Sequence, residues 1–363
     1  MLDCLVIGGG HCGLLSGFFL GEENLNYLIV DSEERIGDVW RKRPDNLRLF
    51  TSRQFCGLAD LPLSGDPEGY ASGHEFADYL AHFAAQKNLN FTVKTRIVAL
   101  RKDKDIFVAV TDSGHIYRAR TVINATGSNQ RAIIPVVAQQ LDDNIQQLTG
   151  ASYRNPQQLP SMAKVLVCGD GASGRQIAVE LAANQCNVSL AHGRARKMVP
   201  NRVLGHDLFW WLHRIGVLYA DRNSLIAKIL RKRDPVPVAA TASNSALVQR
   251  GITLRARAIS AQGNVIQFED GASASFDAVI WCAGYDETID WLHFSELGNA
   301  KELASGKGKT PVKGLFVVGR KWLSCRASEL VLGAERDVLQ AVRYVLQECA
   351  APLVSVQEGY QPL

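Results

Sequence analysis

Two glycine-rich hexapeptides are the part of this 363-residue sequence whose residue types and spacing point most clearly to chemistry. The first is Gly-Gly-Gly-His-Cys-Gly at 8–13, and the second is Gly-Asp-Gly-Ala-Ser-Gly at 169–174. In such turns the first glycine permits a tight exit from a strand, the second lets the backbone approach a pyrophosphate, and the third lets a helix pack closely on the sheet. The spacing therefore predicts two dinucleotide-binding turns, formed by Gly8, Gly10 and Gly13 and by Gly169, Gly171 and Gly174.

The residues that follow the two turns differ in charge. Asp31 ends the apolar run 27–30, where a carboxylate can accept a hydrogen bond from a ribose hydroxyl and would repel a 2′-phosphate. The corresponding run after the second turn ends without an acid, and basic residues follow it: His192, Arg194, Arg196 and Lys197. Because such cations suit a ribose 2′-phosphate, we expect NADPH at the second turn and a dinucleotide without that phosphate at the first.

The segments around the turns predict the elements that position them. Each turn lies between an apolar run that predicts a strand and a segment that predicts a helix: 4–7 and 14–20 for the first, 164–168 and 175–183 for the second. Elsewhere we expect helices at 75–86, 207–218 and 335–348, antiparallel meanders at 91–120 and 252–276, and an irregular basic loop at 231–237.

This order of elements predicts an α/β protein with two Rossmann-like dinucleotide-binding domains. The first domain is expected to comprise residues 1–145 plus 277–363, and the second, at 155–276, to be inserted into it. No recognisable set of acid, base or nucleophile accompanies the two turns. An enzyme with this sequence would therefore use a cofactor for its chemistry, with the protein supplying position and electrostatics.

Composition and charge exclude several other classes of protein. Forty Lys and Arg residues against 36 Asp and Glu residues give a net charge of +4, too small a surplus to indicate nucleic-acid binding. No apolar run approaches the ~20 residues that span a bilayer. The eight cysteines form no C-x-x-C pair and no metal-ligand spacing, so we expect reduced thiols, no metal site and a cytoplasmic protein.

The order of the motifs resembles that of the flavin-containing monooxygenases, including the plant YUCCA type and short bacterial members, over nearly the whole chain. Besides the two turns, the matching stretches are Gly-Asp-Val-Trp-Arg-Lys-Arg at 37–43, Leu-Arg-Leu-Phe at 47–50, Gln-Phe-Cys at 54–56, Ala-Thr-Gly at 125–127, Tyr-Arg-Asn-Pro at 153–156 and Trp-Cys-Ala-Gly-Tyr at 281–285. The chain departs from the family at 143–149, which lacks the family's F-x-G-x-x-x-H fingerprint, and at Gly193, where the family has a cation.

The resemblance implies that the first domain binds FAD and the second binds NAD(P)H. The residues it assigns to FAD are Gly8, Gly10, His11, Cys12, Gly13, Asp31, Val39, Trp40, Arg43, Ala125, Thr126, Gly127 and Gly319. Those it assigns to NAD(P)H are Gly169, Gly171, Ala172, Ser173, Gly174, His192 and Arg194. Thr51 and Ser52 align with the position that the family places over the flavin, which makes them the candidate catalytic residues. Because Gly193 replaces a cation, we expect a modest preference for NADPH, with NADH also accepted.

The resemblance also implies a reaction. NAD(P)H reduces FAD, the reduced FAD reacts with O₂, and one oxygen atom passes to a small soft nucleophile such as a thioether or an amine, or to a ketone. Two alternatives stay open: an NAD(P)H-dependent reductase or oxidase that passes electrons to another acceptor, and a nucleotide-sensing protein that keeps the fold without catalysis. We expect a small-molecule substrate and O₂ as partners, no nucleic acid and no membrane span, and we leave a homodimer open.

Overall fold

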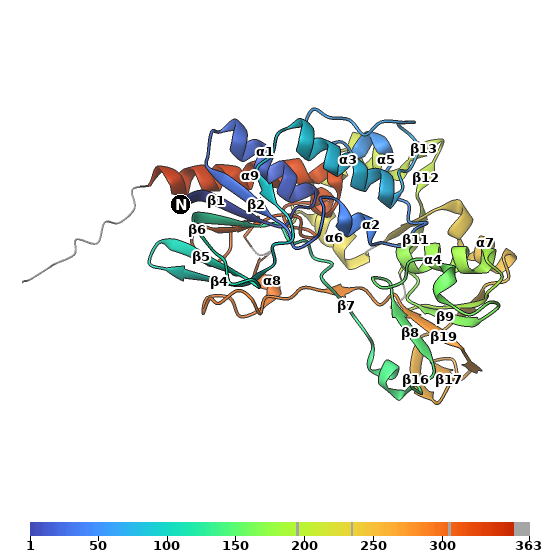
Figure 1. Ribbon diagram of the computed structural model, residues 1–363. Coiled ribbons are helices and arrows are strands. Elements are labelled where there is room, and N and C mark those ends of the chain that lie inside the picture. Colours follow the sequence, from blue (N-terminus) through green and yellow to red (C-terminus); the bar gives the residue numbers. More distant parts are fainter. Residues whose placement is uncertain (194–195, 234, 304–305, 352–363) are drawn as a thin grey trace, which may run out of the picture.

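The computed structural model describes residues 1–193, 196–233, 235–303 and 306–351, which form two units of sheet and helices (Figure 1). The sheet of the first unit has the order β3-β2-β1-β6-β5-β4, with β21 alongside β6. Its strands are β1 (Leu2–Ile7), β2 (Tyr27–Val30), β3 (Phe91–Thr92), β4 (Ile97–Asp103), β5 (Ile106–Thr111), β6 (Ile116–Asn124) and β21 (Leu315–Val317). Strands β1, β2, β3, β6 and β21 are parallel, and β4, β5 and β6 form an antiparallel meander. The meander predicted at 91–120 is thus confirmed except for its start, because β3 pairs in parallel with β2.

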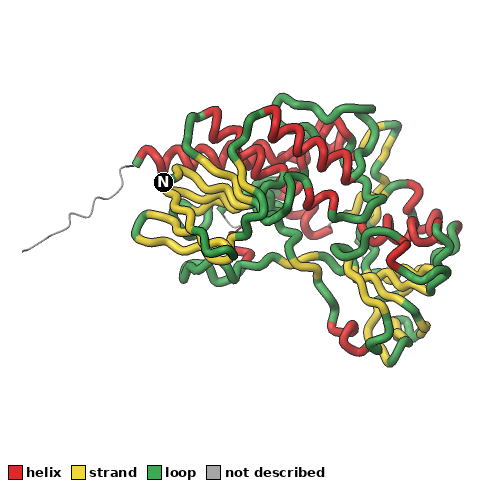
Figure 2. The backbone as a smooth tube through the Cα atoms, viewed as in Figure 1, coloured by secondary structure: helices red, strands yellow, loops and turns green. Residues whose placement is uncertain are grey.

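Three helices cover one face of this sheet, as Figure 2 shows. They are α1 (His11–Glu22), α3 (Gly73–Gln86) and α9 (Val331–Ala350), and their apolar sides share one core with β1. Helix α3 begins earlier than predicted because Ser72 and Glu75 form a capping box that satisfies two N–H groups at its start. The opposite face is covered by the segment 289–303, which contains α8 (Ala300–Leu303) and contributes Leu292, Leu297 and Leu303.

The second unit is built on a smaller parallel sheet of order β15-β10-β9-β19-β8. Its strands are β8 (Gln146–Thr149), β9 (Lys164–Cys168), β10 (Asn187–Ala191), β15 (Thr253–Arg255) and β19 (Ala278–Trp281), with α4 (Ala172–Ala183) and α7 (Asn244–Gln249) as its helices. The predicted meander at 252–276 is only partly antiparallel, because β15 joins the parallel sheet beside β10. The antiparallel part is β16 (Ala258–Gln262), β17 (Val265–Phe268) and β18 (Ser273–Ser275).

The second unit is larger than the predicted range 155–276, because strands on both sides of that range belong to its sheet. Strand β19 pairs with both β9 and β8, and all four of its residues are buried, so the sheet of the second unit extends past residue 277. The chain returns to the first unit only after β19. There β20 (Tyr285–Asp286) pairs with β7 (Arg131–Ala132), so that the two connecting segments run side by side (Figure 1).

The segment 198–238 contains the helix α5 (Leu208–Arg214), where a helix was expected, and elements that the sequence prediction missed. The missed elements are β11 (Met198–Pro200), β12 (Arg202–Val203), β13 (His206–Asp207), α6 (Leu225–Arg233) and β14 (Val236–Val238). The helix predicted at 207–218 is therefore shorter and ends before Gly216, whose φ of +73° belongs to the left-handed region. The irregular loop predicted at 231–237 is wrong, since its basic residues end α6, Pro235 directly precedes β14, and Pro237 lies within β14, which pairs with β11.

Candidate functional site

The first glycine turn connects β1 to α1 and is shaped by contacts that only glycine permits. A Cβ at Gly8, whose φ is +111°, would lie 2.5 Å from the Ala125 carbonyl oxygen, and one at Gly13 would lie 1.8 Å from the Gly8 carbonyl oxygen. At Gly10 a Cβ would meet no heavy atom of the described residues within 4 Å. The first and third glycines are therefore required by the fold, whereas the second leaves room for a ligand at the start of α1.

Three ionisable residues lie at this turn: Asp31, His11 and Cys12. Asp31 accepts hydrogen bonds from the N–H of Gly9 and from the N–H of Glu33 (2.7 Å). Burial raises the pKa of Asp31, although these two hydrogen bonds act in the opposite direction. Burial also lowers the pKa of His11 to about 4 and raises the pKa of Cys12 to about 12. The first turn of α1 thus carries a neutral imidazole and a protonated thiol near neutral pH, so neither side chain adds charge there.

The Ala-Thr-Gly motif that follows β6 lies beside the same turn. The N–H of Ala125 donates to the carbonyl of Ile7 (2.8 Å), and the side chain of Asn124 accepts from the N–H and the hydroxyl of Thr126 (3.2 and 2.8 Å). Gly319, after β21, is close as well, since a Cβ there would lie 3.0 Å from the sulfur of Cys12. The structure thus gathers candidate FAD residues at the ends of three parallel strands of one sheet, although they lie far apart in the sequence.

The motif at 37–43 forms the short helix α2 (Asp38–Arg41), which follows the left-handed Gly37. Trp40 packs edge-on against Phe76 of α3 with ring centroids 5.0 Å apart, whereas 40% of Val39 is exposed. Arg43 reaches the second connecting segment, where it donates to the Tyr285 hydroxyl (3.1 Å) and lies over the Tyr285 ring.

The second glycine turn repeats the geometry of the first between β9 and α4. A Cβ at Gly169, whose φ is +112°, would lie 2.2 Å from the Cys282 carbonyl oxygen, and one at Gly174 would lie 1.9 Å from the Gly169 carbonyl oxygen. Ala172 and Ser173 are the first two residues of α4. Cys282 therefore has the structural role at this turn that Ala125 has at the first, which accounts for the similar motifs that follow β6 and β19.

The basic residues after β10 lie partly outside the described part of the chain. His192 is exposed and hydrogen-bonded through its ring to the Gly193 carbonyl (3.1 Å), and Arg194 lies outside the described residues. Arg196 is close to the turn itself, because its guanidinium nitrogen lies 3.5 Å from the position that a Cβ of Gly171 would occupy. The structure therefore brings one of the predicted cations to the second glycine turn.

Thr51 and Ser52 are buried in a loop that the second unit covers. The Thr51 hydroxyl contacts the sulfur of Cys56 (3.3 Å), and the N–H of Ser52 donates to the carboxylate of Asp207 (2.5 Å). Asp207 is fully buried at the start of α5, where it also accepts from the N–H of Phe209 (2.7 Å). Burial raises the pKa of Asp207, with these hydrogen bonds opposing the shift. A buried carboxyl group thus lies directly beside the two candidate catalytic residues.

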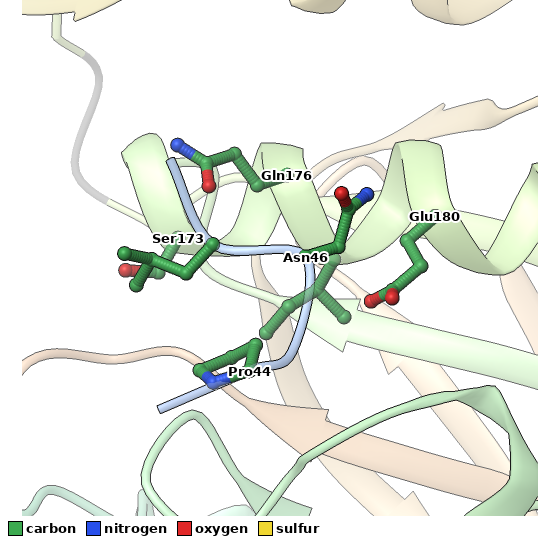
Figure 3. Close-up of a pocket in the computed structure, with 7 residues that line it drawn as sticks. Pro44, Asn46, Ser173, Gln176 and Glu180 are labelled. Atoms are coloured by element: carbon green, nitrogen blue, oxygen red, sulfur yellow. The ribbon is translucent and has the colours of Figure 1, made fainter. Parts of the chain in front are cut away.

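A second contact between the units joins the loop after Arg43 to helix α4. The backbone N–H and C=O of Arg48 exchange hydrogen bonds with the side-chain amide of Gln176 (3.1 Å each), and the N–H of Asp45 donates to the Arg154 carbonyl (2.8 Å). Figure 3 shows this loop lying along α4, with Ser173 beside it. The cavity between them has a volume of about 10 Å³, far too small for a dinucleotide, so we treat it as part of the contact between the units.

Comparison with known proteins agrees with this geometry. A family model described as pyridine nucleotide-disulphide oxidoreductase matches residues 5–204. The sequence is 36% identical over 349 residues to a relative named uncharacterized oxidoreductase CzcO-like, from Geobacillus kaustophilus, with 95% of this chain and 99% of the relative covered. The chain belongs to the pyridine nucleotide-disulphide oxidoreductase family.

This oxidoreductase is also similar to proteins named as monooxygenases. It is 23% identical to the probable indole-3-pyruvate monooxygenase YUCCA8 of Arabidopsis thaliana, with 90% of this chain and 86% of that protein covered. A structure of a flavin-containing monooxygenase from Stenotrophomonas maltophilia superposes with a TM-score of 0.78 at 25% identity, covering 96% of this chain and 99% of that one. These similarities confirm the predicted resemblance, the fold with two Rossmann-like domains, and a flavin-dependent oxidoreductase that uses a pyridine nucleotide.

Several polar residues at the site of this oxidoreductase were missed by the sequence reasoning. One of them is Arg320, which is 1% exposed and donates to Glu287 (2.5 Å), Asn124 (3.2 Å) and Thr126 (3.2 Å). This network ties the second connecting segment, through Glu287, to the strand ends beside the first turn. No local signal marks Arg320, because its partners are supplied by strand pairing, whereas the polar Asn124 at the end of an apolar run could have indicated part of the network.

No helix in the described part of the chain combines the length and apolar character that crossing a bilayer requires.

Proposed function

We propose that this oxidoreductase is an FAD-dependent monooxygenase that consumes NADPH and O₂. One oxygen atom enters the substrate and the other leaves as water, while NADPH and a proton supply the two electrons and the hydrogens that balance the reaction. The observation that carries the proposal is the presence of two glycine turns of the same geometry, each after a parallel strand of its own sheet, in a chain that is similar along its length to a flavin-containing monooxygenase.

The first unit fits FAD. The open space at Gly10 and the N–H groups that α1 leaves without helical acceptors suit a pyrophosphate, and Asp31 can accept from a ribose hydroxyl. Asp337 of α9 lies near the first glycine turn, since its charge adds to burial in raising the pKa of Cys12. One of its buried carboxylate oxygens has no partner among the described residues. When bound, FAD supplies the electron transfer between NADPH and O₂ that no side chain here can perform.

The second unit fits NADPH. Helix α4 presents its N-terminus at Gly171, and Arg196 lies next to that glycine, so a phosphate at the turn would meet both a helix dipole and a guanidinium. We propose that Arg194 and Arg196 share the 2′-phosphate. Because Gly193 offers no side chain for a third contact, the preference for NADPH over NADH is expected to be modest.

The substrate is proposed to be a small soft nucleophile such as a thioether or an amine, with a ketone as the further case. Thr51, Ser52 and Asp207 are at most 4% exposed, so the loop proposed to lie over the flavin keeps water away from that part of the site. Exclusion of water is what oxygen transfer needs most from the protein. The buried Asp207 holds this loop through the Ser52 N–H, which makes it a positioning residue in this proposal.

We also propose a cytoplasmic location, which the eight free cysteines support. That the protein forms a homodimer stays a prediction.

The test is a two-step reaction of the purified flavoprotein. First, the bound flavin is reduced without oxygen by NADPH and, separately, by NADH, and the loss of its absorbance is followed. Then air and an aryl methyl thioether are admitted, and sulfoxide is measured against the NADPH consumed. Sulfoxide in near-equal amount to NADPH supports the proposal. Rapid NADPH consumption with no sulfoxide, and with no amine oxide or ester when an amine or a ketone replaces the thioether, would favour a reductase or oxidase instead.

A further inference from the structure

Helix α6 places aliphatic side chains on the surface instead of in the core. Leu225 is 74% exposed, Ile226 is 50% exposed and Ile229 is 45% exposed, whereas Ala227 is the residue of this helix that is buried. Residues three and four positions apart lie on the same side of a helix, so Leu225 and Ile226 each neighbour Ile229 and the three side chains form one strip. An amphipathic surface helix normally turns such a strip toward the core. The outward apolar strip therefore needs a different explanation.

The same helix holds a concentrated positive charge. Residues 221–233 contain five cations and one carboxylate, a net charge of +4 that equals the net charge of the whole 363-residue chain. The carboxylate, Asp221, is paired with Lys307 (2.5 Å). Lys228, Lys232 and Arg233 are exposed next to the apolar strip. The segment is locally basic up to Asp234, as the segment 192–202 also is, but here the cations accompany an exposed aliphatic strip.

The helix is held on the first unit with its strip outward. The backbone N–H of Arg222, just before α6, donates to the Ser324 carbonyl (2.9 Å), and its guanidinium donates to the Leu323 carbonyl (3.1 Å). Near the other end, Arg231 lies over the ring of Trp322 and donates to the Arg222 carbonyl (3.0 Å). Both ends are thus fixed to the loop that follows β21, and the exposed strip is presented by a supported helix.

We propose that α6 docks this oxidoreductase on the surface of a bilayer that contains anionic phospholipid. A helix lying in the membrane interface inserts aliphatic side chains between the lipid headgroups while lysine and arginine contact the anionic phosphates, and α6 offers both kinds of side chain. Because the helix has nine residues, the contact is reversible and strongly dependent on salt.

Other occupants fit the surface less well. A second copy of the chain would oppose the cations of two α6 helices, and three aliphatic side chains fall short of the roughly 800 Å² that each partner buries in a stable interface. A nucleic acid would use the cations but not the aliphatic strip. An anionic bilayer is the partner that uses both.

The test is sedimentation of the full-length flavoprotein with vesicles. Binding to vesicles of equal parts phosphatidylglycerol and phosphatidylcholine is compared with binding to phosphatidylcholine alone, at low and at high salt. The flavoprotein is expected to sediment with the anionic vesicles at low salt, to be released by high salt, and to stay in solution with phosphatidylcholine. Failure to sediment with anionic vesicles at low salt would overturn the proposal.

Two variants locate the contact. Lys228→Gln/Lys232→Gln/Arg233→Gln is expected to weaken partitioning into anionic vesicles roughly a hundredfold, since each cation near such a surface contributes about one order of magnitude or slightly less. Leu225→Ser/Ile226→Ser/Ile229→Ser keeps the charge and is expected to weaken partitioning at least about tenfold, because the inserted aliphatic area is lost. Retained flavin absorbance and an unchanged circular dichroism spectrum establish that each variant is folded.

Matched substitutions on the meander of the first unit serve as controls. Lys94→Gln/Lys104→Gln/Arg118→Gln removes three exposed cations, and Val98→Ser/Ile116→Ser removes two aliphatic side chains that are 43% and 47% exposed. Both controls are expected to bind vesicles as the wild type does. Equal losses in the controls and in the α6 variants would contradict the proposal. So would a wild-type dimer that the Leu225→Ser/Ile226→Ser/Ile229→Ser variant converts to a monomer, since the strip would then be a self-interface.

Discussion

Replacement of Gly10 by alanine separates binding from folding at the first glycine turn. A Cβ at Gly10 would meet no heavy atom of the described residues within 4 Å, and its φ of −73° is readily adopted by alanine, whereas a Cβ at Gly13 would lie 1.8 Å from a carbonyl oxygen. Gly10 is the N-cap residue of α1, where alanine is less favourable than glycine by about 1 kcal/mol or less. The free energy of unfolding of the Gly10→Ala apoprotein is therefore expected to lie within about 1 kcal/mol of that of the wild-type apoprotein.

The same methyl group would fill the space in which a pyrophosphate meets α1. Loss of one or two charge-assisted hydrogen bonds, at about 1.5–3 kcal/mol each, corresponds to roughly ten- to ten-thousandfold weaker FAD binding. The measurements are the flavin-to-protein absorbance ratio after purification, FAD titration of the apoprotein, and urea unfolding of the apoprotein. Gly171→Ala is the matched control, expected to keep its flavin but to be reduced more slowly by NADPH. Stoichiometric flavin in Gly10→Ala, or equal flavin loss in both variants, would refute the assignment of the first turn.

Three further predictions concern charged residues. Arg194→Ala is expected to raise the apparent KM for NADPH roughly ten- to a hundredfold and to leave that for NADH nearly unchanged, as steady-state kinetics will show; equal changes for both coenzymes would transfer the role to Arg196. Arg320→Met leaves the mostly buried Glu287 unpaired and is expected to lower the free energy of unfolding by about 3–5 kcal/mol, as measured by urea unfolding. The double variant Arg320→Met/Glu287→Gln is expected to lose less. If its loss equalled the sum of the losses in the two single variants, this pairing would be contradicted. Because burial raises the pKa of Asp207, the protonated carboxyl stabilises the fold fully below the ordinary carboxyl pKa, and this contribution is lost as pH rises through the raised pKa. In Asp207→Asn the free energy of unfolding is expected to lack this decline with pH. Identical pH profiles of unfolding for the wild type and the variant would contradict the raised pKa.

The glycine turns could be predicted from the sequence because their requirements are local. A positive φ at Gly8 and Gly169 and the close approach of Gly13 to Gly8 follow from the route of a strand into a helix, which the spacing encodes directly. The position of Asp31 follows in the same way, because it ends the next parallel strand. The resemblance to a known family then extended this local reading to residues such as Gly319, which no short-range pattern connects to the first turn.

The missed features depend on pairing between distant segments. The apolar run that forms β19 could belong to either sheet, and the choice is made by its register with β9 and β8. The burial of Arg320 depends on partners from β6 and from the second connecting segment. The basic residues and prolines at 231–237 predict a loop, whereas 231–233 form the end of helix α6. Asp207 was absorbed into a predicted helix, while its hydrogen bond to Ser52 spans 155 residues.

The measurement that tests the proposed function most directly is the fate of the oxygen atoms. The purified flavoprotein, NADPH and a thioether are incubated under heavy-isotope-labelled O₂ in ordinary water, and the sulfoxide is analysed by mass spectrometry. A monooxygenase with this site is expected to place one labelled atom in each product molecule, with Gly10→Ala forming no labelled product. Sulfoxide without label, or NADPH consumed while all labelled oxygen is recovered as hydrogen peroxide or water, would contradict the account.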